Sequence, residues 1–174
     1  MNILIVVDMQ NDFVSGALGT REAVDIVPRV AERVAAGADL GETILFTRDT
    51  HEENYLETRE GRALPVPHCI RGTEGWEIID QLTEYTVDRT VVDKPTFGSR
   101  ELGRILAAEQ EPVEKITFIG LCTDICVISN AMLAKAALPE VPIYVDPHCC
   151  AGVSPASHGQ ALAAMQVCQI HIED

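Results

Sequence analysis

The sequence has 174 residues, of which 47% are hydrophobic and 23% are charged, and its formal net charge is −14. This length and composition predict one domain over residues 1–174 that can bury a sizeable core. The negative charge argues against nucleic acid or an anionic membrane as a partner, and it favours a small neutral or cationic molecule.

The chain alternates strand patterns with helix patterns along its whole length. Strands are predicted at residues 2–8, 43–47, 89–93, 115–120, 141–145 and 167–172. Helices are predicted at residues 22–37, 74–82, 99–109, 123–137 and 154–165, with Thr123 and Ser154 as N-caps. Six strands joined by helices predict an α/β protein with a single doubly wound, mostly parallel six-stranded sheet and helices on both faces.

The segment 50–73 interrupts this alternation. It has no clear period and contains Gly61, Pro65, Pro67 and Gly72. Loops of this length inside a compact domain are usually functional. We therefore expect this loop to contribute to a site.

Localisation is inferred from the first strand and from the cysteines. The run Asn2–Val7 is too short for a signal peptide and has no basic flank. No apolar stretch reaches the ~18 residues that a membrane span needs. Without an export signal, the six cysteines are expected to be free thiols. We expect a cytoplasmic protein.

Polar side chains follow three of the predicted strands. The first strand runs into Asp8, the third ends at Lys94, and the fourth is followed by a segment that contains Cys126. In doubly wound sheets, the carboxyl ends of the strands meet at the edge where ligands bind. An acid, an amine and a thiol are therefore expected to converge on one cleft.

The predicted position of Cys126 gives its thiol a reason to be reactive. It falls in the first turn of the helix expected from Thr123, where unpaired N–H groups and the helix dipole favour a thiolate. A nearby Lys94 would favour it further, and Asp8 could take the thiol proton and return it to a leaving amine. Asp124 would oppose a thiolate unless its carboxylate points away. Alone, a cysteine in a helix is more often a small core residue.

The sequence motifs in these segments resemble those of the isochorismatase-like cysteine hydrolases, and in particular of their nicotinamidase-like branch. The resemblance rests on Asp-Met-Gln-Asn-Asp-Phe at 8–13, a lysine that ends the third strand, and Gly-x-x-Thr-Asp-x-Cys-Val at 120–127. It runs from residue 4 to at least 155. The resemblance implies one isochorismatase-like hydrolase domain.

The resemblance also implies roles for individual residues. Asp8, Lys94 and Cys126 would form the catalytic triad. A non-proline cis peptide is implied at Leu121–Cys122, and the backbone N–H groups of Cys122 and Cys126 would form an oxyanion hole. Members that cleave isochorismate lack the nucleophilic cysteine, so its presence here argues for amide hydrolysis.

The long loop contains a second group of candidate ligands. Asp49 and His51 end the second strand, and His68 could fold back to join them. One carboxylate and two imidazoles suit Zn²⁺, Fe²⁺ or Mn²⁺, although such histidines can also only brace a polar loop. The resemblance favours metal, because Asp-x-His with a distal His-Cys is the metal-binding pattern of nicotinamidases. Some of these use a glutamate as a further ligand, and Glu60 matches its spacing better than Glu57.

The substrate-binding residues are less constrained by the sequence. Phe13 and Phe97 could sandwich a flat aromatic ring, or could belong to the core. Thr50 stands where the family usually has tryptophan, so one aromatic wall could be missing or come from elsewhere. Trp76 is expected to pack its own helix. The residues after the fifth strand are expected to line the cleft: His148, Cys149 and Cys150.

The sequence thus predicts a cysteine-dependent amide hydrolase. Our first hypothesis is a nicotinamidase that forms a thioester and carries a divalent metal, with Zn²⁺ ahead of Fe²⁺ or Mn²⁺. One alternative is an amidase or N-carbamoyl hydrolase of the same family with a different small substrate. Another is a catalytically silent binding protein. By analogy with relatives, we expect a homo-oligomer.

Overall fold

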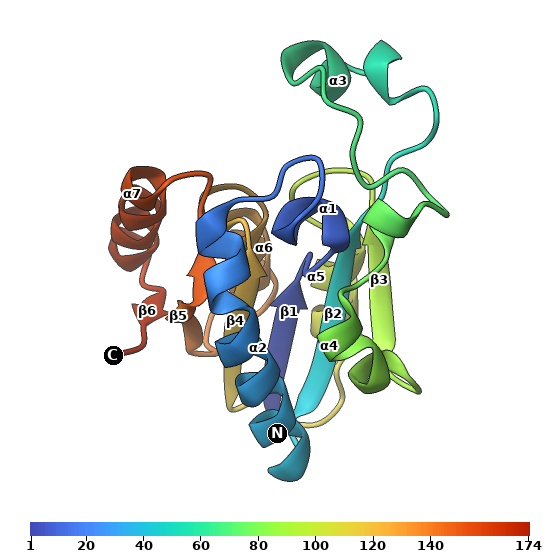
Figure 1. The fold of residues 1–174 in the computed structure, drawn as a ribbon. Helices are drawn as coiled ribbons and strands as arrows, with labels where there is room; N and C mark the ends of the chain where they lie inside the picture. Colours follow the sequence, from blue (N-terminus) through green and yellow to red (C-terminus); the bar gives the residue numbers. More distant parts are fainter.

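A parallel sheet of six strands forms the centre of the structure, a computed structural model that describes residues 1–174 (Figure 1). The strands are β1 (Asn2–Val7), β2 (Thr43–Asp49), β3 (Thr90–Lys94), β4 (Lys115–Leu121), β5 (Ile143–Ala151) and β6 (His171–Ile172). Their spatial order is β3-β2-β1-β4-β5-β6, and every neighbouring pair is parallel. The predicted doubly wound α/β fold is confirmed.

Helices cover both faces of this sheet. They are α1 (Asn11–Val14), α2 (Arg21–Asp39), α3 (Arg59–Ala63), α4 (Asp80–Thr83), α5 (Arg100–Ala107), α6 (Ile128–Ala137) and α7 (Pro155–Val167). Residues of α2 and α4 pack on one face, and residues of α5, α6 and α7 pack on the other. None of the helices combines the length and the apolar character needed to cross a membrane.

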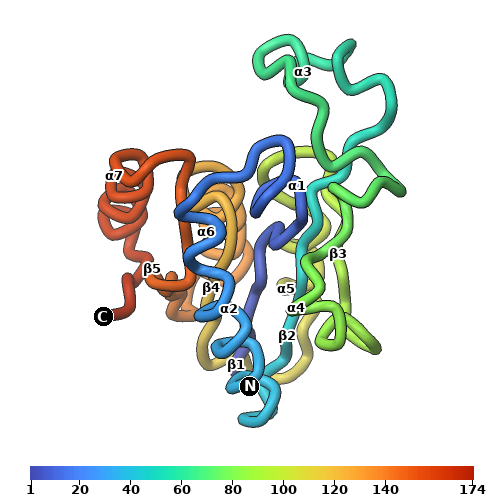
Figure 2. The backbone as a smooth tube through the Cα atoms, in the orientation of Figure 1, coloured from blue at the N-terminus to red at the C-terminus, as the bar shows by residue number.

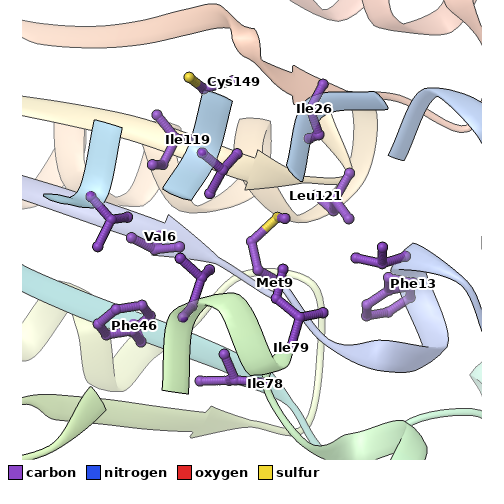
Figure 3. Close-up of a cluster of buried hydrophobic side chains, with 14 of the residues drawn as sticks. Val6, Met9, Phe13, Ile26, Phe46, Ile78, Ile79, Ile119, Leu121 and Cys149 are labelled. Atoms are coloured by element: carbon purple, nitrogen blue, oxygen red, sulfur yellow. The ribbon is translucent and has the colours of Figure 1, made fainter. Parts of the chain in front are cut away.

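The central strand β1 explains why its sequence is continuously apolar. Successive side chains of a strand point to opposite faces. Leu4 and Val6 therefore join the core under α2, whereas Ile3 and Ile5 join the core under α5 and α6. Both faces of a parallel strand are buried, so no polar residue alternates with the apolar ones. Figure 3 shows part of the first core, in which Met9 continues the apolar lining beyond the end of β1.

The position of the site follows from the strand order. The chain moves from β1 outward to β2 and β3, then returns to the other side of β1 with β4. Strand order therefore reverses between β1 and β4, and ligands of such sheets bind beyond the carboxyl ends of the strands at this point. The Figure 2 trace shows the loops after these strands gathered at one end of the sheet.

The long loop predicted at 50–73 contains short ordered elements. We call its central part, residues 52–67, the arm; it includes a tight turn at Tyr55–Glu57 and helix α3. The arm stands out beyond the rest of the chain in Figure 1. Its base is tied to the sheet edge, because His51 forms an isolated bridge with Ile70.

Several element boundaries differ from the prediction, and the helix expected from Thr123 begins as α6 only at Ile128. The helix expected at 74–82 is a turn at Glu74–Trp76 followed by the separate helix α4. Strand β5 continues to Ala151 instead of ending at Val145. The last strand is shorter than expected, because α7 extends to Val167 and a turn follows before β6 begins.

Candidate functional site

The carboxyl ends of β1, β3 and β4 bring three predicted residues into one buried cluster. The Nζ atom of Lys94 lies 2.6 Å from Oδ2 of Asp8 and 3.3 Å from Sγ of Cys126. Asp8 and Lys94 are fully buried, and only 4% of Cys126 is exposed. A carboxylate, an ammonium and a thiol are therefore close enough to exchange protons and share charge. Their catalytic roles stay a prediction at this point.

The backbone around Asp8 is unusual. Asp8 has a φ of 48°, in the left-handed region that non-glycine residues seldom adopt. Its Oδ1 accepts a hydrogen bond of 2.7 Å from the hydroxyl of Thr47. On β4, a Cβ at Gly120 would lie only 2.1 Å from the carbonyl oxygen of Val7, so glycine is required for the two strands to meet here. These constraints fix the carboxylate of Asp8 beside Lys94.

Cys126 lies in a wide turn, Thr123–Val127, that leads into α6. The carbonyl of Cys122 accepts hydrogen bonds from the N–H of Ile125 at 3.1 Å and of Val127 at 3.0 Å. The N–H of Cys126, which lies between them in sequence, makes no bond to this carbonyl. Such π-type turns are rare and occur frequently at functional sites.

The neighbours of this turn differ in part from expectation. The peptide bond Leu121–Cys122 is cis, as the resemblance implied. The prediction that Thr123 caps the helix is wrong, because its hydroxyl lies 2.8 Å from Nδ1 of His158 instead. The carboxylate of Asp124 accepts the N–H of Val153 at 3.1 Å and so faces away from the thiol.

The surroundings of the Cys126 thiol favour its neutral form over the thiolate. Burial raises the pKa of Cys126 well above its usual value, the carboxylate of Asp8 raises it further, and Lys94 opposes them. Burial lowers the pKa of Lys94, but Asp8, Cys126 and Asp49 together outweigh burial and raise this pKa well above its usual value. The sequence had suggested a ready thiolate. The structure instead places the thiol beside an ion pair, where burial and the carboxylate of Asp8 both raise the pKa of Cys126 against the opposing effect of Lys94.

Four residues beside this cluster form a group with the donors of a metal site. Asp49, His51, Glu60 and His68 each offer one ligand atom, and these atoms lie within 4.8 Å of one another. Nε2 of His51 is buried without a hydrogen-bond partner. Nδ1 of His68 bonds the carbonyl of Val66 at 2.8 Å, which leaves its Nε2 directed to the group. This donor set fits a divalent cation such as Zn²⁺.

The charge balance also fits a cation. Asp8 and Asp49 are both buried against one ammonium, since Nζ of Lys94 lies 3.1 Å from Oδ1 of Asp49. Two buried carboxylates facing one cation leave an uncompensated negative charge, which a bound divalent ion would offset. Of the two glutamates considered from the sequence, Glu60 joins the ligand group, whereas Glu57 is exposed.

A small, largely apolar cavity of about 50 Å³ opens onto both groups. Its lining includes Phe13 and Phe97, so both predicted aromatic residues border the cavity; Phe97 is 43% exposed at its edge. Thr50 does not line it, because its hydroxyl accepts the indole N–H of Trp76 at 2.8 Å. The remaining lining residues are Leu18, Asp49, Glu60, Leu64, His68, Cys122, Ile125 and Cys126.

The expectation that the residues after Val145 line this cleft is wrong. His148 is exposed at the surface, and Cys149 and Cys150 are buried in the two cores on opposite faces of the sheet. Strand β5 lies on the far side of β4 from β1, so its end reaches a different part of the surface.

Two supporting residues were missed by the sequence reasoning. The side chain of Gln10 donates to the carbonyls of Asp49 and Trp76, both at 2.8 Å, and accepts the N–H of Asp49 at 2.7 Å. The carboxylate of Asp12 accepts the N–H of Cys69 at 2.8 Å, at the far end of the long loop. Both residues lie in the segment 8–13, which was the only available signal.

Comparisons with known proteins extend over nearly the whole chain. The family model described as the isochorismatase domain matches residues 2–173. A pyrazinamidase of Pyrococcus horikoshii, solved in complex with zinc, has a TM-score of 0.85 and 32% identity, covering 99% of this chain and 98% of that one. The nicotinamidase/pyrazinamidase of Mycobacterium tuberculosis is 26% identical and covers 99% of this chain and 98% of its own length. The nicotinamidase of Schizosaccharomyces pombe is 26% identical, and the match covers 97% of this chain and 91% of that protein.

Proposed function

The chain belongs to the isochorismatase family, and we propose that it is a nicotinamidase, which hydrolyses nicotinamide to nicotinate and ammonia. One observation carries the proposal. Cys126 lines the same apolar cavity as Asp49, Glu60 and His68 of the ligand group, and Asp49 also contacts Lys94. A nucleophile, a proton carrier and an anchor for a heteroaromatic ring are thus combined in one small site. The similarity to nicotinamidases and pyrazinamidases supports this substrate class.

In the proposed acylation, Sγ of Cys126 attacks the carboxamide carbon while its proton passes to Asp8. The backbone N–H groups of Cys122 and Cys126 donate to the oxygen that becomes negative. The C–N bond then breaks, and Asp8 delivers the proton to the departing nitrogen. Ammonia leaves, and the acyl group remains on Cys126 as a thioester.

In the proposed deacylation, water attacks the thioester carbon and Asp8 takes a proton from it. The C–S bond breaks, the acid is released, and the proton returns from Asp8 to the sulfur. Lys94 contacts both Asp8 and Cys126, so its ammonium stabilises whichever of the two carries the negative charge. The same carboxylate thus serves both halves of the reaction.

We propose that Asp49, His51, His68 and Glu60 hold a divalent cation, with Zn²⁺ first and Fe²⁺ or Mn²⁺ as alternatives. The donor set, the buried negative charge and the zinc-bearing relative support this assignment. Such a cation supplies a Lewis-acidic anchor for the lone pair of a pyridine nitrogen. Phe13 borders the same cavity and would lie against the ring.

The function is tested by ammonia release from nicotinamide, pyrazinamide and an N-carbamoyl compound, with metal analysis of the same sample. We expect release from nicotinamide, none by Cys126→Ala, and wild-type rates for Cys168→Ala, which removes an exposed cysteine outside the site. Ammonia release by Cys126→Ala at the wild-type rate would refute the mechanism. Hydrolysis of the carbamoyl compound alone, by a protein without stoichiometric metal, would favour the related carbamoyl hydrolases.

We also propose a cytoplasmic location and a homo-oligomeric state. The six cysteines are all unpaired in the structure, which suits a reducing compartment. The oligomeric state rests on analogy with relatives, and sedimentation of the purified protein measures it directly.

A further inference from the structure

Tyr55 is an unusual residue for a protruding loop. It lies at the start of the tight turn Tyr55–Glu57 in the arm, yet only 1% of it is exposed, and it is among the largest fully buried side chains. It belongs to neither of the two hydrophobic cores. Its burial therefore has a local cause within the arm.

The ring of Tyr55 packs against both candidate ligand imidazoles. Its centroid lies 4.7 Å from that of His51 and 5.0 Å from that of His68, with tilted and edge-on geometry. The two imidazoles lie 4.9 Å apart. The three rings thus contact one another, and Phe13 covers His68 from a further side at 5.5 Å.

The two imidazoles differ in how they are oriented. A metal-binding histidine usually bonds through its second ring nitrogen to a fixed acceptor, which sets the orientation of the ring. His68 has such a bond, from Nδ1 to the carbonyl of Val66. His51 has no such bond from Nδ1, and its Nε2, which is buried without a hydrogen bond, points to the ligand group at 3.0 Å from Oδ2 of Asp49. Outside the ligand group itself, packing against Tyr55 is therefore the contact that fixes the ring of His51.

The hydroxyl of Tyr55 reaches the other side of the ligand group. It donates to the carbonyl of Leu64 at 2.9 Å, and the N–H of Leu64 bonds the carbonyl of Glu60 at 2.8 Å. A Cβ at Gly61 would lie only 2.0 Å from the carbonyl oxygen of Tyr55, so α3 is packed tightly onto the turn. One side chain therefore contacts both imidazoles and the helix that carries Glu60.

We propose that Tyr55 is a positioning residue for the divalent-cation site: its ring sets the orientation of His51 and packs against His68, and its hydroxyl holds the helix that carries Glu60. This inference rests on the metal part of the proposed function. At most metal-binding histidines, a hydrogen bond to the second ring nitrogen orients the imidazole. At His51, the ring of Tyr55 would have this role.

The test uses the full-length protein, stripped of metal and titrated with Co²⁺ against a competing chelator, with the visible ligand-field spectrum as a second readout. Tyr55→Leu removes the ring, and we expect Co²⁺ affinity to fall ~10–100-fold, as for other residues that orient ligands, with a changed spectrum. The matched control is Phe118→Leu, which removes a fully buried ring from the core on the other side of the sheet. It should lower thermal stability without changing affinity or spectrum.

A gentler variant keeps the test valid if Tyr55→Leu does not fold. Tyr55→Phe keeps the ring and loses only the hydroxyl bond to Leu64, so we expect a loss of about threefold to tenfold in Co²⁺ affinity. Because this loss acts through the helix that carries Glu60, it should disappear in a Glu60→Gln background. A double-mutant cycle measures this coupling.

The outcomes separate this inference from the function on which it rests. Wild-type Co²⁺ affinity and spectrum in Tyr55→Leu would overturn the role of Tyr55 and leave the metal site intact. An equal loss of Co²⁺ affinity in Phe118→Leu would also overturn the role of Tyr55. The same holds if the effect of Tyr55→Phe on Co²⁺ affinity is unchanged in the Glu60→Gln background. If the wild-type protein binds Co²⁺ no better than His68→Ala, the proposed metal site fails, and the role of Tyr55 fails with it.

Discussion

Replacing Asp8 by asparagine should separate the reactivity of the thiol from catalysis. The carboxylate of Asp8 raises the pKa of Cys126, second only to burial, whereas Lys94 lowers it. Asparagine keeps the shape and can still accept from Thr47, but it removes the negative charge. Lys94 then acts on the sulfur with less opposition. We therefore expect Cys126 to react faster with an alkylating agent, while amide hydrolysis is lost because no group carries the proton.

The geometry sets the size of the effect. Oδ2 of Asp8 and Sγ of Cys126 lie within 2.6 Å and 3.3 Å of the same nitrogen of Lys94. Two charges no more than about 6 Å apart repel by roughly 3 kcal/mol at an effective dielectric constant of about 20. Removing this repulsion raises the thiolate population ~100-fold. A less basic thiolate is also less nucleophilic, with a Brønsted coefficient near ~0.5, so the net gain in alkylation rate is about tenfold.

The assay follows iodoacetamide labelling of the peptide that contains Cys126 by mass spectrometry, in parallel with single-turnover ammonia release. Asp93→Asn is the matched control, because Asp93 neighbours Lys94 in sequence but pairs outward with Arg48 and Arg71. Its labelling rate should match that of the wild type. Slower labelling in Asp8→Asn would refute the charge argument, and retained ammonia release would refute the role of Asp8 as proton carrier.

Three further outcomes follow from the same contacts. Removing the metal should speed tryptic cleavage after Arg59 and Arg62, which are both exposed on α3, more than cleavage after other exposed arginines. The reason is that the ligand group ties α3 to the sheet edge through Glu60. Burial raises the pKa of Asp8, and the hydrogen bond from Thr47 lowers this pKa. Thr47→Val removes that bond and should therefore raise the pKa of Asp8. Because Asp8 must be ionised to accept the thiol proton, the acid limb of the kcat/KM profile should move to higher pH. Lys94→Met leaves two buried carboxylates without their cation, which costs ~3–5 kcal/mol and should lower the urea midpoint by about 2 M.

The sequence was sufficient for the fold and for the cluster of Asp8, Lys94 and Cys126 because both follow from parallel-sheet geometry. Strands buried on both faces are recognisable as apolar runs, and their carboxyl ends meet at one edge. The end of β5 was missed because Pro147 and His148 interrupt its apolar pattern, and because its register with β4 shifts between Phe118 and Gly120.

Supporting contacts could not be predicted, because they join residues that are distant in sequence or depend on the shape of the arm. Gln10 bonds Asp49 and Trp76, which are 39 and 66 residues away. Tyr55 carries no motif, and its contact with two imidazoles arises only once the arm folds back. The raised pKa of Cys126 was also missed, because it depends on how fully the whole cluster is buried.

Asp49 links the two halves of this site. Its Oδ1 lies 3.1 Å from Nζ of Lys94, and its Oδ2 lies 3.0 Å from Nε2 of His51. Burial raises the pKa of Asp49, but its contacts with His51 and His68, together with the charge of Lys94, outweigh burial and hold this pKa well below the usual value. A cation at the ligand group would draw the charge of Asp49 toward itself, so the ammonium of Lys94 would act more strongly on Asp8 and the thiol. Linkage is reciprocal, so ionisation of the thiol would strengthen cation binding by the same factor. The ligand group and the nucleophile are therefore one electrostatic unit, in which Asp49 carries the coupling.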